Sequence, residues 1–269
     1  MEYSKKIAIR ELTALGFTVD EIPETSSKRA GLCVTDGQHV YHVEAKGKFD
    51  LDDIPAASQD DFYRRKDKLT HNNTISGVLR DAHTQLKGTP NVDGAFKLIW
   101  FHAEAGLQWQ QAFATFYGTM PVSGLYPNQD KGSVCFYFTF NASFLMPDVE
   151  ALILTEGDGL HLCMNEFSPR RNDFKATRLY NAFCGEERDP DKLEATGQII
   201  RCRSTVSRKN EADVIKALKE QTGVDFVANP VTRYSFRLIA DFRRPKSTNI
   251  FSRSSRLFSG FSSGWRGFC

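Results

Sequence analysis

The chain has 269 residues, of which 41% are hydrophobic and 25% charged, the composition of an ordinary globular protein with a sizeable core. No stretch approaches the roughly 18 consecutive apolar residues of a membrane-spanning helix, and the charged N-terminus is unlike a signal peptide. We therefore expect a cytoplasmic protein with no membrane partner. The six cysteines show neither Cys-x-x-Cys nor zinc-finger spacing, which favours reduced, buried thiols.

Charge is unevenly distributed along the chain. The net charge is +2, but residues 1–199 hold 21 Lys and Arg against 28 Asp and Glu, whereas residues 200–269 hold 14 against 5. A basic C-terminal part on an acidic body could contact phosphates, and a solvated basic tail explains the same numbers.

The first hundred residues predict six elements in the order α-β-β-β-α-β. Apolar spacing indicates the helices, alternation indicates the strands, and Asp36-Gly37 is typical of a hairpin turn. The expected elements are a helix at 2–16, strands at 17–22, 32–34 and 40–46, a helix or pair of helices at 57–87, and a strand at 96–101. Residues 48–56 are expected to form a polar loop.

The rest of the chain predicts a mixed α+β extension. We expect a helix at 106–117, a strand at 134–140, a hairpin of strands at 149–155 and 159–164, and a helix at 209–222 closed by Gly223. The Ser-, Phe- and Arg-rich end has no consistent period. The predicted organisation is a core at 1–102, an extension packed on it at 103–245, and a loosely ordered tail at 246–269.

The segment Val40-Tyr-His-Val-Glu-Ala-Lys46 carries the most informative chemistry. If residues 36–39 form the turn, Thr35 faces Val40 and residue 31 lies opposite Glu44. Side chains alternate along a strand, so Glu44 and Lys46 share a face. Phosphodiester hydrolysis uses carboxylates to hold Mg²⁺ and a lysine to orient water or stabilise charge. A solvent-facing pair is the alternative interpretation of an isolated Glu-x-Lys.

The order of elements around this pair is similar to the PD-(D/E)XK nuclease superfamily. The resemblance covers residues 1–102 and includes "GFTVDEI", "KRAGLCVTDG", "VYHVEAKG" and "GVLRDAHTQL". It implies a restriction-endonuclease-like α/β core and a metal-dependent endodeoxyribonuclease using Mg²⁺ or Mn²⁺. It also implies that Glu44 binds metal with Glu11 and the Ala45 carbonyl, and that Lys46 positions water.

One departure from the family pattern concerns the acid expected on the second strand. Gly31 stands at that position, where a shared metal needs a second ligand. Three explanations remain open: a pseudo-nuclease that only binds, an inactivated variant of an active enzyme, or a substitute acid. Asp36 fits turn chemistry better than metal binding, and Glu24 or Asp50 would have to enter from loops.

Several other residues are weaker candidates. Gln85 lies on the helix after the Glu-x-Lys pair, where the family often carries a polar residue facing the site; a solvent-facing Gln is the alternative. Lys28 and Arg29 could bind a phosphate of the nucleic acid, or belong to a solvated loop. His83 is expected at the surface.

The aromatic residues between the two halves of the chain are predicted to form core. A platform for base stacking is the alternative. The residues concerned are Trp100, Phe101, Trp109, Phe113, Phe116 and Tyr117.

The leading functional hypothesis is a Mg²⁺-dependent endonuclease acting on DNA, or a form of it inactivated by Gly31. The rival is a non-catalytic nucleic-acid-binding or interaction module on the same fold. The oligomeric state stays open, with a homodimer as one arrangement that would pair two sites across a duplex.

Overall fold

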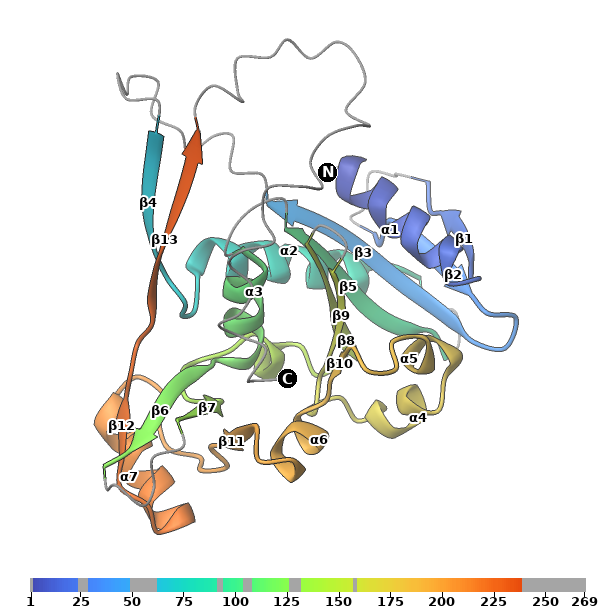
Figure 1. The fold of residues 1–269 in the computed structure, drawn as a ribbon. Helices are drawn as coiled ribbons and strands as arrows, with labels where there is room; N and C mark the ends of the chain where they lie inside the picture. The colour runs from blue at the N-terminus through green and yellow to red at the C-terminus, as the bar shows by residue number, and fades with distance from the viewer. Residues whose placement is uncertain are drawn as a thin grey trace.

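The computed structural model describes residues 2–23, 29–48, 62–90, 94–103, 108–125, 132–156 and 159–238. The protein is a mixed α/β structure in which helices cover both faces of a seven-stranded sheet (Figure 1). The strand order is β1-β2-β3-β5-β8-β9-β10. The strands are β1 (Thr18–Glu21), β2 (Leu32–Thr35), β3 (Val40–Lys48), β5 (Phe96–Ala103), β8 (Ala151–Glu156), β9 (Gly159–Met164) and β10 (Glu187–Arg188).

The hairpin of β2 and β3 has the predicted register. The strands are antiparallel, and Thr35 pairs with Val40 while Leu32 pairs with Val43. Strand β5 then runs parallel to β3, and β8 runs parallel to β5. Helix α2 (Asn73–Gly88) lies in the connection between β3 and β5. The end of β3 is therefore bordered by β2, β5 and the crossover helix.

Helices divide the molecule into three layers. One face of the sheet is covered by α1 (Glu2–Ala14), α4 (Arg171–Lys175) and α5 (Arg178–Ala182), and the other by α2 and α3 (Gln108–Tyr117) (Figure 1). Strand β3 separates its side chains accordingly. Val43 and Ala45 pack in the cluster that includes α1, so Glu44 and Lys46 lie on the α2 face.

Helix α2 forms the C-terminal part of the region predicted as a helix or pair of helices at 57–87. The Asn72 side chain caps its start by accepting hydrogen bonds from the backbone N–H groups of Thr74 and Ile75 at 3.0 and 3.1 Å. Ile75, Leu79 and Leu86 are fully buried on the face that packs against the sheet. Local capping and the apolar stripe thus agree with the tertiary structure.

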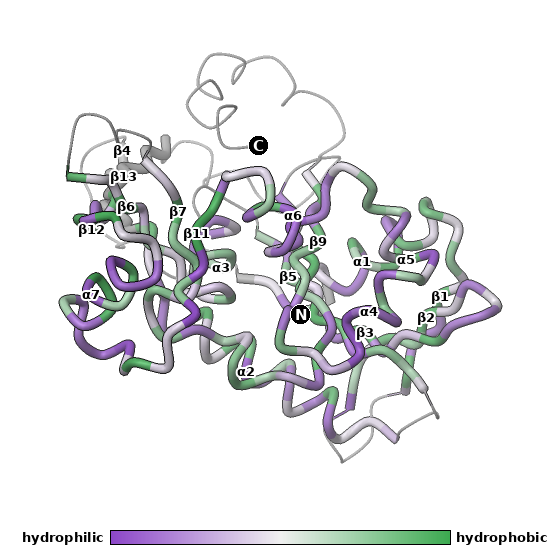
Figure 2. Tube along the Cα trace, turned by 90° about the horizontal axis from the view of Figure 1, so that it is seen from below, coloured by the Kyte–Doolittle hydropathy of each residue, from purple (hydrophilic) through white to green (hydrophobic). Residues whose placement is uncertain are grey.

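A second sheet extends the molecule beyond α3. Its four strands are ordered β11 (Ile199–Arg201), β7 (Ser133–Phe136), β6 (Met120–Gly124) and β12 (Phe226–Ala228). The short helix α6 (Pro190–Ala195) precedes β11, and a 3-10 turn at Ser143–Leu145 precedes β8. Helix α7 (Glu211–Thr222) ends at Gly223, whose φ of 75° supplies the predicted left-handed cap. Alternating hydrophilic and hydrophobic residues along α7 match its amphipathic pattern (Figure 2).

Two predicted elements are wrong. Within the expected helix at 57–87, residues 62–68 form strand β4 (Phe62–Lys68), which pairs antiparallel with β13 (Thr232–Leu238). Pairing with a strand far along the chain has overridden local helical preference. The expected strand at 134–140 stops at Phe136, because Tyr137 adopts a φ of 60° and turns the chain.

The main sheet also takes β8, β9 and β10 from beyond residue 102, so residues assigned to the extension complete it. The expected loop at 48–56 and the tail at 246–269 lie outside the described residues apart from Lys48. No helix within the described ranges is long and apolar enough to cross a membrane.

Candidate active site

The Glu-x-Lys pair of β3 forms a buried polar cluster with helix α2. Glu44 is 5% exposed and Lys46 is 4% exposed. The Lys46 Nζ lies 3.0 Å from Glu44 Oε1 and donates to Gln85 Oε1 at 2.7 Å. Asp81 Oδ2 lies 3.2 Å from the same ammonium. The predicted grouping of Glu44, Lys46 and Gln85 is therefore present, and it is not a solvent-facing strand pair.

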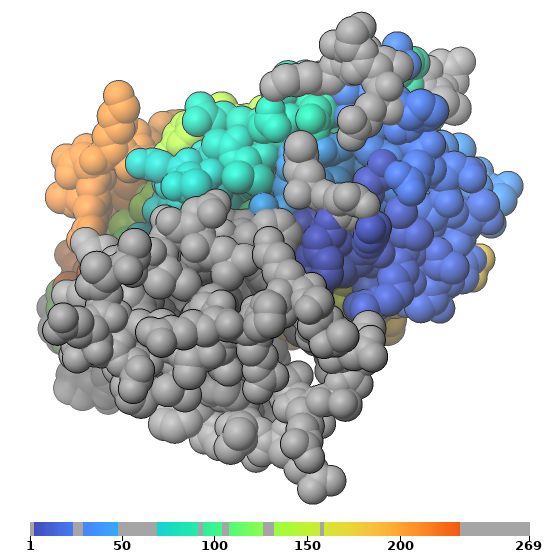
Figure 3. Space-filling model, turned by 90° about the horizontal axis from the view of Figure 1, so that it is seen from above, coloured from blue at the N-terminus to red at the C-terminus, as the bar shows by residue number. Residues whose placement is uncertain are grey.

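Two of these residues come from one face of a helix. Asp81 and Gln85 are four residues apart on α2, so both face β3. Figure 3 views the molecule from above, where the turquoise surface of α2 adjoins the blue N-terminal segments. Asp81 is not among the residues predicted from the sequence, although its spacing of four from Gln85 places the two on one helix face.

Gly31 lies directly against the Glu44 carboxylate. Its N–H donates to Glu44 Oε2 at 2.7 Å. A Cβ added at this glycine would lie 3.5 Å from Glu44 Oε2 and 3.6 Å from Lys5 Cε, both ordinary contact distances. The position that would hold the family's second acid is therefore adjacent to Glu44, as the hairpin count predicts, and has room for a side chain.

The start of β2 is fixed to the same helix. The Ala30 N–H donates to Thr89 Oγ1 at 2.6 Å, and that hydroxyl donates to the Gln85 carbonyl oxygen at 2.9 Å. Gly31 is therefore held in place from both sides, by Glu44 and by the end of α2. The neighbouring Arg29 is half-buried, and its Nε has no hydrogen-bond partner among the residues that the structure describes. Lys28 lies outside the described residues.

Burial dominates the electrostatics of Glu44. Desolvation raises the pKa of its carboxyl above the ordinary value, and the nearby Asp81 carboxylate adds to that rise. The Lys46 ammonium and the Gly31 N–H lower the pKa but do not cancel the effect of burial. The cluster has two carboxylates for one ammonium, so its net charge is −1 when all three groups are ionised.

Glu11, which the resemblance predicts as a metal ligand on the first helix, makes its described contacts away from the Glu44 cluster. Its carboxylate accepts a hydrogen bond from Arg10 Nε at 2.9 Å, and none of its described contacts is with Glu44 or Lys46. Lys5 instead lies beside Gly31, with its Nζ 2.5 Å from Glu21 Oε2. A metal-binding role for Glu11 or for the Ala45 carbonyl stays a prediction.

Of the three acids considered as substitutes for the missing one, only Asp36 lies among the described residues. Burial alone would raise its pKa, but hydrogen bonds from the His39 and Gln38 N–H groups and the Tyr41 hydroxyl lower it to about 2. Asp36 is thus committed to the hairpin turn, as predicted. Glu24 and Asp50 lie outside the described residues.

The described residues do not fit a resident Mg²⁺. They contain no group of three His, Cys, Asp or Glu side chains that could hold a metal ion. Mg²⁺ requires near-octahedral oxygen coordination. The two carboxylates present, Glu44 and Asp81, are both bound to Lys46. We therefore derive no metal-dependent reaction step from the described side chains of this site.

His83 corrects the expectation of a surface residue. It is 7% exposed, and its Nε2 lies 2.6 Å from Asp148 Oδ1. The other oxygen of Asp148 accepts from Lys97 Nζ at 3.1 Å. This group links α2 to the strand β5 and to the approach to β8, so His83 is a structural residue away from Glu44.

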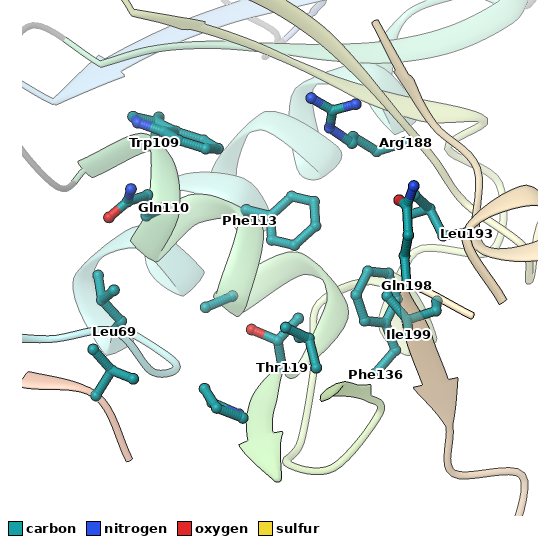
Figure 4. Close-up of a pocket in the computed structure, with 14 residues that line it drawn as sticks. Leu69, Trp109, Gln110, Phe113, Thr119, Phe136, Arg188, Leu193, Gln198 and Ile199 are labelled. Atoms are coloured by element: carbon teal, nitrogen blue, oxygen red, sulfur yellow. The ribbon is translucent and has the colours of Figure 1, made fainter. Parts of the chain in front are cut away.

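A separate apolar pocket lies between α3 and the second sheet (Figure 4). Its volume is about 100 Å³, and Trp109, Phe113, Phe136 and Arg188 are among its lining residues. The pocket contains none of the Glu44 cluster. Of the aromatic residues predicted as core, four are fully buried, and the partly buried Trp109 and Phe113 line this pocket. The four are Trp100, Phe101, Phe116 and Tyr117.

Compared with known proteins, the chain matches no family model, no curated protein and no solved structure. The functional interpretation therefore depends on the geometry of the residues themselves.

Proposed function

We propose that this chain binds DNA on a PD-(D/E)XK-type nuclease core whose cleavage site has lost its second acid at Gly31. One observation carries the proposal. A side chain at position 31 would begin 3.5 Å from Glu44 Oε2, inside a cluster that also contains Lys46 and Gln85. A carboxylate at position 31 would therefore lie beside that of Glu44, and carboxylate oxygens are ligands that Mg²⁺ uses in proteins.

Nothing in the backbone requires glycine at this position. Gly31 is not among the residues with positive φ, and an added Cβ would make only ordinary contacts. A glycine that is neither conformationally required nor sterically required is consistent with loss of a functional side chain.

Loss of the second acid explains why cleavage would be lost, because the remaining cluster cannot hold a cation that would offset its own charge. Two carboxylates and one ammonium leave a net charge of −1, which repels a phosphodiester. Lys46 is held by Glu44, Asp81 and Gln85, so it is oriented but largely neutralised. In the proposal, Lys46 would stabilise developing negative charge only when a further acid and a cation complete the site.

The rival proposal is an active endonuclease with an acid supplied by another segment, such as Glu24 or Asp50. Retention of both Glu44 and Lys46 in a buried pair favours this alternative, because burial of an ion pair costs free energy that an apolar pair would avoid. A non-catalytic interaction module without nucleic-acid affinity would have no use for the pair.

A plasmid assay separates these proposals. Supercoiled plasmid is incubated with Mg²⁺ or Mn²⁺ and the native chain, Gly31→Asp, Gly31→Asn or Gly31→Asp/Lys46→Ala. We expect nicking only with Gly31→Asp, since Asn has the same size but lacks the charge. Cleavage by the native chain would favour the rival. No cleavage by any variant would overturn the proposal that an acid is missing at position 31.

A further inference from the structure

Strands β4 and β13 form a two-stranded ribbon that stands apart from both sheets (Figure 1). They pair antiparallel over seven positions, from Lys68 with Thr232 to Phe62 with Leu238. The Leu69 N–H donates to the Val231 carbonyl oxygen at 3.0 Å and continues the pairing into the body of the protein. Neither strand pairs with any other strand in the described ranges.

The ribbon concentrates positive charge from two distant parts of the sequence. Six of its fourteen residues are Lys or Arg and only Asp67 is acidic. The cations are Arg64, Arg65, Lys66, Lys68, Arg233 and Arg237. The body before residue 200 is acidic overall, so this element is a local exception. Neither strand alone would make the pattern evident in the sequence.

The register distributes these residues over two different faces. Residues directly opposite each other in an antiparallel pair share a face, and alternate residues along a strand do so too. One face, which we call the aromatic–basic face, carries Phe62, Arg64, Lys66 and Lys68 on β4 and Tyr234 and Phe236 on β13. It contains no acidic residue.

The second face differs in composition. It carries Arg65, Arg233 and Arg237, together with Tyr63 and the single acid Asp67, which pairs with Arg233. The two faces thus hold three cations each, but the aromatic–basic face has three aromatic positions and no acidic residue, whereas the other has one of each. This difference provides a matched internal comparison.

Single-stranded nucleic acid is the ligand that suits the aromatic–basic face. Proteins bind single strands by a row of cations along the backbone and by aromatic side chains on which bases stack. Alternate positions on a strand are about 7 Å apart, so the three cations form a row about 14 Å long. Tyr234 and Phe236 pair with Lys66 and Arg64, so each aromatic position adjoins a cation.

We propose that the aromatic–basic face of the β4–β13 ribbon binds single-stranded nucleic acid. The proposal rests on the proposed function only for the class of partner, because binding by the ribbon requires neither a metal nor residue 31. Strand β4 begins 14 residues after the end of β3 at Lys48, so the ribbon is connected through one segment to the strand that carries Glu44 and Lys46.

Fluorescence anisotropy with a labelled 20-mer single strand, in EDTA and over a range of NaCl, tests the proposal in the full chain. The test variant is Arg64→Gln/Lys66→Gln/Lys68→Gln, and its matched control is Arg65→Gln/Arg233→Gln/Arg237→Gln on the other face. A second control, Lys209→Gln/Lys216→Gln/Lys219→Gln, removes three exposed cations near or on α7. Thermal unfolding verifies that all three remain folded.

We expect the aromatic–basic triple variant to lose about tenfold or more in affinity and about 2 units of salt slope, since each single-strand phosphate contact contributes about 0.7. Both controls should lose less than threefold. Tyr234→Leu/Phe236→Leu should weaken binding with the salt slope unchanged, whereas Tyr63→Leu should not. A matching duplex should bind more weakly than the single strand.

Equal losses from both faces, or equal affinity for duplex and single strand, would overturn the proposal. The two proposals fail independently. If Gly31→Asp cleaves DNA but the ribbon variants bind normally, the ribbon proposal falls and the proposed function stands. If the ribbon variants lose binding but Gly31→Asp never cleaves, the ribbon proposal stands and the nuclease site falls.

Discussion

Two buried ionic clusters in this molecule differ in how completely their charges are compensated. In the second sheet, Arg201 contacts Glu166 Oε2 at 2.5 Å, Asp191 Oδ1 at 2.8 Å and Glu194 Oε2 at 2.5 Å. Further cations pair with two of these carboxylates: Arg203 with Glu194, and Arg171 and Lys175 with Asp191. Burial would raise the pKa values of Glu194 and Asp191, but their bonds to Arg201 lower them. In the Glu44 cluster, burial outweighs the ammonium, and the pKa of Glu44 is raised.

The difference separates a structural brace from a cluster in which a buried carboxyl keeps a raised pKa. A guanidinium presents several donors in a fixed plane, so Arg201 can satisfy three carboxylates at once. The Lys46 ammonium is a point charge shared among Glu44, Asp81 and Gln85. Perturbed pKa values in a buried cluster are typical of functional sites, where protein stability is reduced in favour of chemistry.

The largest expected effect is on the structural cluster. Arg201→Met should reduce the free energy of unfolding by about 3–5 kcal/mol, because it removes the cation that pairs with Glu166 and one of the cations that pair with Glu194 and Asp191. Urea unfolding at neutral pH measures the loss. Lys219→Met is the control, since its pair with Asp225 is surface-exposed and should contribute about 0–1 kcal/mol. Equal losses would show that the Arg201 cluster is not a brace.

The next effect concerns Gly31. Without a divalent cation, Gly31→Asp should lower the free energy of unfolding by about 2 kcal/mol at neutral pH, because a third carboxylate joins Glu44 and Asp81. Gly31→Asn has the same shape and no charge, so it should lose clearly less. Unfolding of both variants in EDTA tests this. An Asp variant as stable as the Asn variant would place position 31 away from Glu44.

The two clusters should respond oppositely to pH. The pKa of Glu44 is raised in the folded protein. Its contribution to the free energy of unfolding therefore falls as the pH rises from the unfolded pKa of about 4.5 through the folded pKa. The pKa of Glu194 is lowered in the folded protein. Its contribution to the free energy of unfolding is therefore complete above the unfolded pKa of about 4.5 and is lost as the pH falls through the folded pKa.

Unfolding of Glu44→Gln and Glu194→Gln across pH 4–8 therefore sharpens the comparison. Relative to the native chain, Glu44→Gln should gain stability with rising pH, whereas Glu194→Gln should lose it. Glu150, whose pKa burial raises to about 7, provides a reference for the first behaviour. Curves of the same sign for Glu44→Gln and Glu194→Gln would contradict the contrast.

The smallest expected effect is at Gln85. Gln85→Leu removes one hydrogen bond to Lys46 and should cost about 1–2 kcal/mol, with Lys87→Met on the exposed side of α2 as a neutral control. Thermal or urea unfolding measures both. No loss for Gln85→Leu would mean that Lys46 finds another partner.

The parts of the candidate site that depend on turn type, strand alternation and helix signals could be predicted from the sequence. The Asp36-Gly37 turn sets the register of β2 and β3, and that register brings position 31 to Glu44. Alternation along β3 then places Lys46 on the same face. Gln85 follows from the resemblance, and Asn72 and the apolar stripe define its helix.

The remaining parts depend on contacts between distant segments. Strand β4 exists because β13 pairs with it from about 170 residues away, and its local sequence does not alternate apolar and polar residues. Helix α1 packs on the sheet in an orientation about its own axis that places Lys5, and not Glu11, beside Gly31. His83 is buried because Asp148 lies opposite it. These outcomes could not be predicted from local periodicity.

The central claim is that position 31 is the missing half of a metal-binding pair, and Mn²⁺ titration followed by electron paramagnetic resonance tests it most directly. The free Mn²⁺ signal should show no specific site in the native chain, one site in Gly31→Asp, and none in Gly31→Asp/Glu44→Gln. Tight binding by the native chain, or no binding by Gly31→Asp, would contradict the claim.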